Sequence, residues 1–570
     1  MKHTNERNIT LYSAGFAATA VMLTLAQAPI GLWPLAWVAY VPFILVCSRF
    51  EKTTPDPFFL IAYIVGAGFW LGNIYWMSYV TVAGWISFCL YTAILWPILA
   101  MTVRWCRSKR IPLFLSVPIL VVGIEQSQGF LLGGFNWLYL GHSQYANTTL
   151  IQIADIFGAT GISFLVAMVN GLIAEWALSI RGGRPPINWG AKFTTSAFVI
   201  AAVAGTLIYG NWRIGQAEGC VKAGPIVAAV QTNVPQSVKQ SFAAEEEIFE
   251  ELLGQSKQCI PAGAKLVVWP ETMVQAVLNR QIWPYLQAPE KNEAFDKAIR
   301  EHSRETAYVL VGAYDIQPTE RKGKEDNWGN YNTAFLYRPD GNQAPEKYYK
   351  IHLVPFGEFI PFTNIPVIHN LLLKMTPYDF DYTLEAGTEY TAFEMNAEAN
   401  ATNKFGVIIC YEDAVPYVVR RFALDGEGHK RIDWLVNISN DGWFVKFEDN
   451  KVITSTEQSQ HTAICAFRAV ENRLAVVRSV NTGISCMIDT LGRIRDGYAA
   501  GNLPAKAFDR RGVAGWFADR VPIDPRITFF SKYGQWLDFS CQLCLAGIII
   551  IQVAEKFIFR KQIKKEAIKK

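Results

Sequence analysis

Apolar stretches of about 20 residues recur along this chain, and they constrain its fold more than any other feature. That length is what an α-helix needs to cross a hydrocarbon core of ~30 Å. Eight stretches are predicted to be membrane spans, at roughly 9–28, 31–48, 58–79, 83–103, 112–132, 160–179, 193–210 and 537–557. The fifth differs from the others because Glu125, Gln126 and Gln128 fall within it. The pattern predicts a polytopic α-helical membrane domain of about eight spans.

The basic residues predict how these spans are oriented. Lys and Arg precede span one, lie between spans two and three, follow spans four and six, and fill the tail after span eight. The loops near 28–31, 80–83 and 133–159 contain neither residue. Because cytoplasmic loops carry the excess of Lys and Arg, both termini are predicted to be cytoplasmic. Seven spans then place the segment that follows them on the outer side of the membrane.

The chain is accordingly predicted to have three parts. Seven transmembrane helices occupy 1–210, an outer domain occupies 211–536, and an eighth helix with a basic cytoplasmic tail occupies 537–570. From Ile226 onward, short β-type runs alternate with helical patterns, and the clearest helices lie at 242–257, 291–305 and 455–472. Such alternation indicates a layered α/β fold. The outer domain, at about 300 residues, is within the range of a single enzyme domain.

Three short segments of the outer domain follow apolar β-type runs and carry reactive side chains. Glu271 ends a Trp-Pro-Glu segment, Lys350 precedes Leu353–Glu358, and Cys410 begins Cys-Tyr-Glu-Asp. Loops at the ends of packed strands are where α/β folds display reactive groups. A carboxylate, an ammonium and a thiol suffice to take an acyl group onto sulfur and pass it on. We predict Cys410 as the nucleophile, Glu271 as its base, and Lys350 as the charge that stabilises the oxyanion.

Ordinary structural roles stand beside these predictions. An isolated Cys after an apolar strand is often a small buried hydrophobe, and Glu271 with Lys350 could be a surface ion pair. Disulfides would be permitted in an outer compartment, and either Cys220 with Cys259 or Cys465 with Cys486 could pair. The sequence does not decide between these possibilities.

Other residues near the three segments are assigned supporting roles. Glu358 and Glu412 are predicted to hold Lys350 and shape the site. Tyr411 and Trp443 fit either the walls of an acyl-chain pocket or core packing.

No cofactor or metal is expected from the motifs. His352 and His461 have no evident metal-ligand partner in the sequence, which favours packing or surface roles. The chain has no zinc-ligand spacing, phosphate-binding glycine loop or nucleic-acid patch. Nucleic acid is therefore not an expected partner.

The ordered combination of these motifs resembles the nitrilase-like carbon–nitrogen hydrolase superfamily. With its membrane segments, nearly the whole chain is similar to the apolipoprotein N-acyltransferase family. Additional matching stretches are 134–138, 141–144, 231–236, 437–444, 468–473 and 481–485. Two residues depart from the family pattern: Gln240 stands where Trp is common, and Val445 where Gly is usual. The resemblance implies a four-layer αββα sandwich on the membrane domain, with Glu271, Lys350 and Cys410 as its catalytic residues.

The resemblance also implies a two-step acyl transfer without a cofactor. Cys410 would accept an acyl chain from a phospholipid, with phosphatidylethanolamine the expected donor. The α-amino group of the diacylglyceryl-cysteine at the N-terminus of an apolipoprotein would then receive that chain as an amide, in the last step of lipoprotein maturation. The expected protein is a multi-pass monomer of the bacterial inner membrane whose catalytic domain faces the periplasm.

Two other functions stay open at this point. A membrane-anchored nitrilase or amidase that hydrolyses a small amide would share the same core, and a non-catalytic membrane scaffold would retain only the fold. The apolar segment 360–384 likewise has two interpretations, a short core helix or a membrane-facing arm over the active site.

Overall fold

The computed structural model describes residues 2–49, 57–181, 189–239, 244–318, 328–361, 365–373, 382–398, 401–449 and 451–569. The chain divides into two compact units. We call them the helical unit (Met1–Tyr75, Trp85–Gly210 and Gln535–Lys570) and the α/β unit (Trp76–Gly84 and Asn211–Gly534).

The helical unit contains apolar helices of very different lengths, some of which run past its boundaries. They are α1 (Lys2–Ala26), α2 (Val41–Cys47), α3 (Phe58–Asn73), α4 (Val82–Ala93), α5 (Leu95–Ser108), α6 (Leu113–Gln128), α7 (Thr148–Ile151), α8 (Ala154–Phe157), α9 (Ala159–Arg181), α10 (Trp189–Cys220) and α18 (Trp536–Lys569). Among the described residues, five segments are long and apolar enough to cross a membrane: Glu6–Ala26, Val82–Ser108, Ala159–Ile180, Trp189–Cys220 and Trp536–Ile558.

Three of the eight predicted spans fall on shorter apolar helices than expected. The stretches at 31–48, 58–79 and 112–132 correspond to Trp33–Cys47, Phe58–Asn73 and Leu113–Gln128. The first is divided into a 3-10 helix and α2, each with a proline in its first turn, where the missing N–H is tolerated. The second ends at Asn73, and the chain continues as the 3-10 turn η2 (Tyr75–Tyr79).

Two β-sheets form the centre of the α/β unit. The seven-stranded sheet has the order β14-β15-β1-β2-β3-β4-β5, and the six-stranded sheet has the order β13-β12-β11-β8-β7-β6. The first contains β14 (Ala499–Ala500), β15 (Gly515–Ile523), β1 (Lys222–Gln231), β2 (Leu266–Val268), β3 (Tyr308–Pro318), β4 (Trp328–Tyr337) and β5 (Gln343–Tyr349). The second contains β13 (Ile494–Arg495), β12 (Cys486–Ile488), β11 (Ala475–Val480), β8 (Trp434–Ser439), β7 (Ala401–Ile409) and β6 (Ala392–Glu398). A separate hairpin pairs β9 (Lys446–Glu448) with β10 (Lys451–Ile453).

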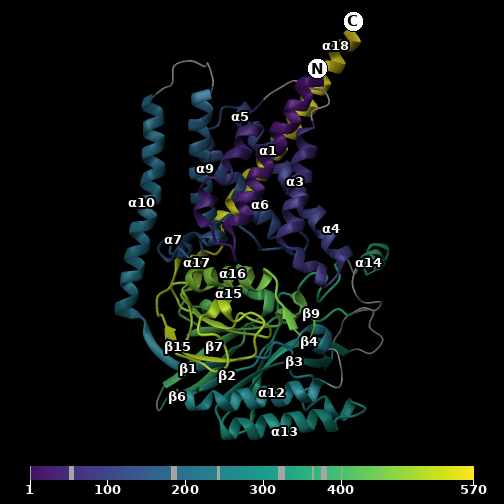
Figure 1. Cartoon of the computed structure of the whole chain (residues 1–570), viewed down its shortest axis with the longest axis vertical. Coiled ribbons are helices and arrows are strands. Elements are labelled where there is room, and N and C mark those ends of the chain that lie inside the picture. The colour runs from purple at the N-terminus through teal and green to yellow at the C-terminus, as the bar shows by residue number, and fades with distance from the viewer. Residues whose placement is uncertain are drawn as a thin grey trace. The chain divides into compact units, whose positions relative to one another are not determined.

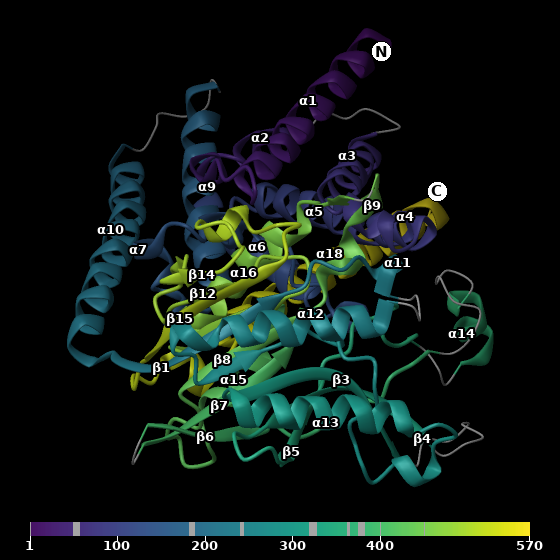
Figure 2. The same ribbon diagram turned by 60° about the horizontal axis from the view of Figure 1, so that its bottom comes forward.

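Helices cover the outer faces of both sheets (Figure 1). The helices of this unit are α11 (Gln236–Lys239), α12 (Glu245–Gln258), α13 (Glu290–Glu305), α14 (Pro366–Leu373), α15 (Pro416–Ala423), α16 (Glu457–Asn472) and α17 (Phe529–Tyr533). Helices α12 and α13 lie together over the seven-stranded sheet (Figure 2), whereas α15 and α16 lie on the other side of the sandwich. The sheets face each other directly, because Ser479 Oγ of β11 lies 2.8 Å from the carbonyl oxygen of Val230 in β1. The four-layer αββα prediction is confirmed, as are the three helices that the sequence marked most clearly.

The strand directions bring several strand ends to one edge. Strands β1, β2 and β3 are mutually parallel, and β7, β8 and β11 form a parallel set in the other sheet. Strand β5 runs in the same direction as β3, because both are antiparallel to β4. Strands β8 and β11 are buried along their whole length, as expected for parallel strands covered on both faces. Loops at the carboxyl ends of such strands form the ligand sites of open α/β sheets.

The segment Trp76–Gly84 groups with the α/β unit, although the sequence analysis assigned it to the first helical domain. The Trp76 ring packs edge-on against Phe444 at 4.8 Å, and its Nε1–H donates to Gln460 Oε1 at 3.3 Å. The Lys446 ammonium lies 5.0 Å from the centre of the Tyr79 ring. These contacts hold the segment against the 3-10 turn η9 (Asp441–Phe444) and its neighbours.

Part of the segment 360–384 lies outside the described residues, namely 362–364 and 374–381. Its described helix, α14, presents Val367 with 81% of its surface exposed. A core position for that residue is therefore wrong, and the membrane-facing arm remains a prediction.

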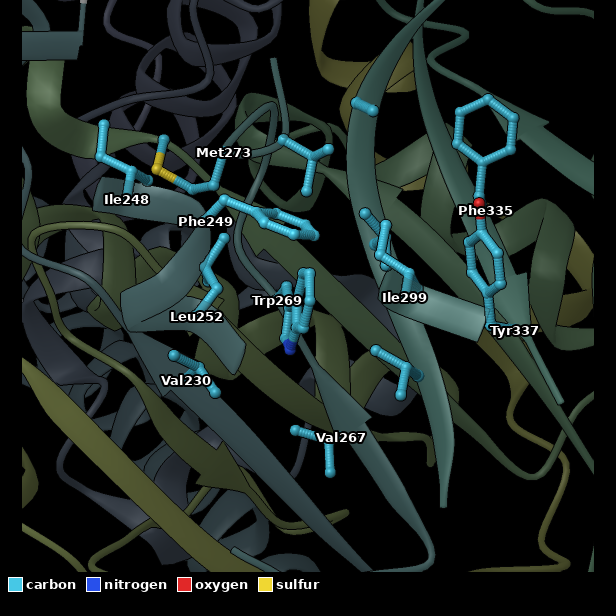
Figure 3. Packing of buried hydrophobic residues seen from close by; sticks show 14 of the residues in the cluster. Val230, Ile248, Phe249, Leu252, Val267, Trp269, Met273, Ile299, Phe335 and Tyr337 are labelled. Atoms are coloured by element: carbon cyan, nitrogen blue, oxygen red, sulfur yellow. The ribbon is translucent and has the colours of Figure 1, made fainter. Parts of the chain in front are cut away.

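A core of aromatic and aliphatic side chains joins α12 and α13 to the seven-stranded sheet (Figure 3). The Phe249 ring meets Phe295 edge-on with centroids 4.3 Å apart, and it lies 6.1 Å from Trp269. Since Phe249 is 7% exposed, Phe249→Ala would leave a cavity between α12 and the sheet. We expect a loss of about 3–5 kcal/mol in the free energy of unfolding.

The thermal unfolding midpoint in detergent measures this loss. The neighbouring exposed residue provides a control, because Glu250→Ala on the same helix should change the stability by only about 0.5 kcal/mol. Equal midpoints for the two variants would contradict the packing described here.

Candidate active site

The three predicted catalytic residues follow strands whose carboxyl ends meet. Glu271 lies three residues after β2, Lys350 directly follows β5, and Cys410 directly follows β7. The first two come from the seven-stranded sheet and the third from the six-stranded sheet. The structure thus brings together at one edge of the sandwich three residues that are far apart in sequence.

Lys350 is an ammonium buried among acceptors. Its side chain is 1% exposed, and Nζ lies 2.8 Å from Glu358 Oε1 and 3.5 Å from Glu271 Oε1. Burial opposes its charge, but the Glu358 and Glu271 carboxylates outweigh burial and raise the pKa of Lys350 well above its ordinary value. Lys350 therefore remains a fixed positive charge at neutral pH.

The Glu271 carboxylate is held at both oxygens. Asn332 Nδ2 of β4 donates to Oε1 at 2.6 Å, and the backbone N–H of Asn440 donates to Oε2 at 2.7 Å. Asn332 Nδ2 also lies 3.1 Å from Glu358 Oε1. One amide thus bridges the two carboxylates that face Lys350. The sequence analysis missed Asn332, because β4 shows no motif at that position.

Cys410 begins the 3-10 turn η8 (Cys410–Ala414) in an unusual backbone conformation. Its φ is +53°, a left-handed value that is costly for a residue with a Cβ and that concentrates at functional sites. The residue as a whole is partly exposed, and the carbonyl oxygen of Cys410 accepts from Asn437 Nδ2 at 3.1 Å.

The surroundings of Cys410 favour a protonated resting thiol. Burial of the thiol and the nearby Glu271 carboxylate raise the pKa of Cys410, while Lys350 lowers it. For the predicted attack by the Cys410 sulfur, a base would have to remove this proton. Glu271 is the carboxylate that acts most strongly on this thiol.

Glu412 connects the Cys410 turn to the segment after Lys350. It is fully buried and accepts from the N–H of Ile409 at 2.7 Å, of Ile351 at 2.8 Å and of His352 at 2.9 Å. The Tyr348 hydroxyl donates to the same carboxylate at 2.9 Å. Burial raises the pKa of Glu412 to about 7, although the backbone N–H groups lower it. Four residues at or just after strand ends of the two sheets thereby donate hydrogen bonds to one side chain.

The two predicted pocket aromatics differ in burial. Tyr411 is 8% exposed, and its ring centre lies 5.9 Å from that of His352. Trp443, in η9, is half-buried. His352 Nδ1 lies 2.9 Å from the Tyr417 hydroxyl, so this histidine belongs to an aromatic cluster beside the turn.

The expectation that His461 lacks partners of ligand type is wrong. It is buried, with the carboxylates of Asp413, Asp441 and Glu457 around its ring. Atoms of Asp441, Glu457 and His461 that could coordinate a metal ion lie within 4.8 Å of one another. The residues are separated in sequence by unequal intervals, which is why no motif revealed the cluster. The pairs Cys220 with Cys259 and Cys465 with Cys486, which could have formed disulfides, are free thiols.

Two family profiles match the two parts of the chain. Residues 19–172 match the apolipoprotein N-acyltransferase N-terminal domain, and residues 226–501 match carbon-nitrogen hydrolases. The chain is 30% identical over 551 residues to the apolipoprotein N-acyltransferase of Geobacter metallireducens, covering 94% of this chain and 93% of the relative. It is 26% identical to that of Chlorobaculum tepidum, covering 92% of each chain.

The chain belongs to the apolipoprotein N-acyltransferase family. Family membership confirms the resemblance drawn from the motifs and identifies the protein as an acyltransferase built on a carbon–nitrogen hydrolase domain. Among solved structures, an amidase from Nesterenkonia sp. is similar to 53% of this chain and 92% of its own length, with 16% identity and a TM-score of 0.32.

Two residues of this N-acyltransferase depart from the family pattern. Gln240 lies outside the described residues. Val445 directly follows η9 with an extended backbone and is 8% exposed. A buried extended position accommodates a β-branched side chain, so Val445 fits locally without strain.

Gly312 of β3 allows the Glu271 segment to approach the sheet. A Cβ at this position would lie 2.5 Å from the Pro270 carbonyl oxygen and 2.8 Å from Glu271 Cα. Both atoms are backbone, so Gly312→Ala must displace the segment that carries Glu271. A misplacement of about 1 Å can cost ~100-fold in rate, and we expect N-acyltransferase activity to fall by about that factor.

The activity of detergent-purified protein tests this prediction. Gly254→Ala in α12 is the matched control, because a Cβ there would meet no atom within 4 Å. Activity of Gly312→Ala equal to that of Gly254→Ala would show that the approach of the two backbones does not matter for catalysis.

Proposed function

We propose that this protein transfers an acyl chain from a phospholipid, through a thioester on Cys410, to the α-amino group of the N-terminal diacylglyceryl-cysteine of apolipoproteins. Phosphatidylethanolamine is the proposed donor. The observation that carries the proposal is the convergence of Cys410, Glu271 and Lys350 at one edge of the sandwich in a member of this family.

The first half-reaction forms the thioester. Cys410 Sγ attacks the ester carbonyl carbon while its proton passes to the Glu271 carboxylate. Negative charge develops on the carbonyl oxygen, and the Lys350 ammonium stabilises it. The acyl carbon–oxygen bond then breaks, and the proton on Glu271 passes to the departing alkoxide of the lysophospholipid.

The second half-reaction forms the amide. The α-amino nitrogen of the lipoprotein attacks the thioester carbonyl, and Glu271 accepts a proton from that nitrogen. Lys350 again faces the oxyanion. The carbon–sulfur bond breaks, and the proton on Glu271 returns to the sulfur of Cys410, which restores the resting thiol.

The supporting contacts suit this cycle. Glu358 and Asn332 hold Lys350 and Glu271 in place, so neither group must reorganise when charge develops. Glu271 is 5% exposed and Lys350 is 1% exposed, which leaves little access for bulk water. Keeping water away from the thioester favours transfer over hydrolysis. We propose Tyr411 and Trp443 as walls for the acyl chain.

We propose that the protein is a monomer of the bacterial inner membrane with residues 211–536 on the periplasmic side. Five described helices are long and apolar enough to span a bilayer, and Lys and Arg concentrate in alternate loops. This orientation would give Cys410 access to phospholipid esters of the outer leaflet.

Intact mass spectrometry of the purified protein with phosphatidylethanolamine tests the function. We expect a hydroxylamine-labile gain of one acyl chain that a diacylglyceryl-cysteine peptide discharges. Cys410→Ala should abolish the adduct. Cys259→Ala, which removes another buried thiol of the same unit, should retain it.

Glu271→Gln and Lys350→Met should each leave the lipid unreacted over the time in which the unmodified protein is fully acylated. No adduct on folded unmodified protein, together with hydrolysis of small amides, would favour the amidase alternative. Absence of both reactions would favour the scaffold.

A further inference from the structure

A cluster of buried charged side chains includes one residue of the turn that carries Cys410. Its members are Asp413 of η8, Asp441 of η9, Glu457 and His461 of α16, and Arg478 of β11. Each of the five is at most 2% exposed. None of the steps proposed above uses this cluster, yet burying so many charges is costly unless they compensate one another.

His461 lies at the centre of the cluster and contacts acceptors on both sides. Its Nε2 lies 2.6 Å from Asp413 Oδ1. Its Nδ1 lies 3.3 Å from Asp441 Oδ2 and 3.2 Å from Glu457 Oε1. An ionised carboxylate only accepts hydrogen bonds, so both ring nitrogens act as donors and the ring is an imidazolium.

The charges of the cluster balance when Glu457 is protonated. His461 and Arg478 supply two positive charges, and Arg478 is ion-paired with Asp413. Burial and the Asp441 charge raise the pKa of Glu457, and its Oε2 has no hydrogen-bond partner among the described residues. A neutral Glu457 then leaves the charges of Asp413 and Asp441 to offset the two cations, which makes the cluster neutral overall.

Other titratable groups also face the cluster. The Cys465 thiol of α16 interacts with Asp413 and Arg478, and the Cys410 thiol is close enough to respond to Asp441 and His461. Burial raises the pKa of Cys465, so this thiol adds no charge at neutral pH.

Two of the three carboxylates that His461 contacts, Asp413 and Asp441, belong to segments that position a catalytic group. Asp413 is in the same 3-10 turn as Cys410. Asp441 Oδ1 accepts from Ser439 Oγ at 2.6 Å, and the residue between them, Asn440, donates its N–H to Glu271 Oε2 at 2.7 Å. One imidazolium therefore links the turn of the nucleophile to the loop that holds the base.

We propose that His461 is a positioning residue for acyl transfer, and that it holds Cys410 and Glu271 in mutual alignment through Asp413 and Asp441. The proposal rests on the function proposed above. His461 touches neither substrate; it acts by fixing the two turns that follow the neighbouring strands β7 and β8. Rates of this type of chemistry depend steeply on such alignment.

The test compares His461→Gln with His302→Gln in folded protein below its unfolding temperature. His302 is the control, because it is 2% exposed, its ring is hydrogen-bonded to Ser256 Oγ at 2.7 Å, and it lies on α13, which carries none of the proposed catalytic residues. We expect His461→Gln to lower the maximal rate of thioester formation about 10- to 100-fold, as loss of an orienting partner does at other sites. The lipid concentration for half-maximal rate should stay unchanged, and His302→Gln should behave like the unmodified protein.

A double-mutant cycle with Asp441→Asn separates positioning from general destabilisation. If the two residues act through their mutual contact, the double variant should lose no more rate than the worse single variant. Independent contributions would multiply and would contradict the proposal. In the double variant, Asp441→Asn also removes the buried negative charge that His461→Gln would leave without its partner. The double variant is therefore expected to fold even if His461→Gln alone is destabilised.

Three further results would overturn the inference. The first is an unchanged maximal rate in folded His461→Gln. The second is a rise in half-saturating lipid concentration with an unchanged maximal rate. The third is a stoichiometric metal ion in the purified protein that is lost in His461→Gln, since that would make the cluster a metal centre.

Failure of the inference is distinguishable from failure of the proposed function. If the unmodified protein forms no thioester, the proposed function fails. If the unmodified protein and His461→Gln form it equally fast, only the role of His461 fails.

Discussion

The buried ammonium of Lys350 is the constraint on which the active site depends. Removing such a charge from water costs several kcal/mol unless ionised and hydrogen-bonded partners surround it. Glu358 and Glu271 supply the negative charge, and Asn332 fixes the position of both carboxylates. The requirement to compensate one charge therefore fixes the end of β5, the loop after β2 and the middle of β4. The same arrangement holds the cation that the proposed mechanism uses to stabilise the oxyanion.

A second group of compensated charges stabilises the other side of Cys410. Glu412 gathers backbone N–H groups from the segments before Cys410 and after Lys350, and His461 joins the turns η8 and η9. Buried polar groups are costly unless satisfied, so these networks allow few alternative loop conformations. The left-handed backbone of Cys410 persists in that setting. Rigid surroundings on both sides suit the proposed reaction, in which both half-reactions use the same three groups.

The segment Trp76–Gly84 belongs to the α/β unit, although apolar helices precede and follow it in the sequence. This segment connects α3 to α4, yet Trp76 packs on Phe444 and donates to Gln460. Phe444 ends the turn η9 that contains Asp441, and Gln460 precedes His461. A connection between two apolar helices is thus part of the same framework that positions the candidate catalytic residues.

The sequence by itself determined the α/β class, the three reactive segments and the family, because strand periodicity and short motifs are local properties of the chain. It also indicated apolar helices, but it could not show that proline and chain turns shorten those at 31–48 and 58–79. Only the tertiary structure brought Asn332 to Glu271 and surrounded His461 with three carboxylates. Those contacts depend on the order of strands in two sheets. That order arises from packing between distant segments, which the local pattern of residues does not encode.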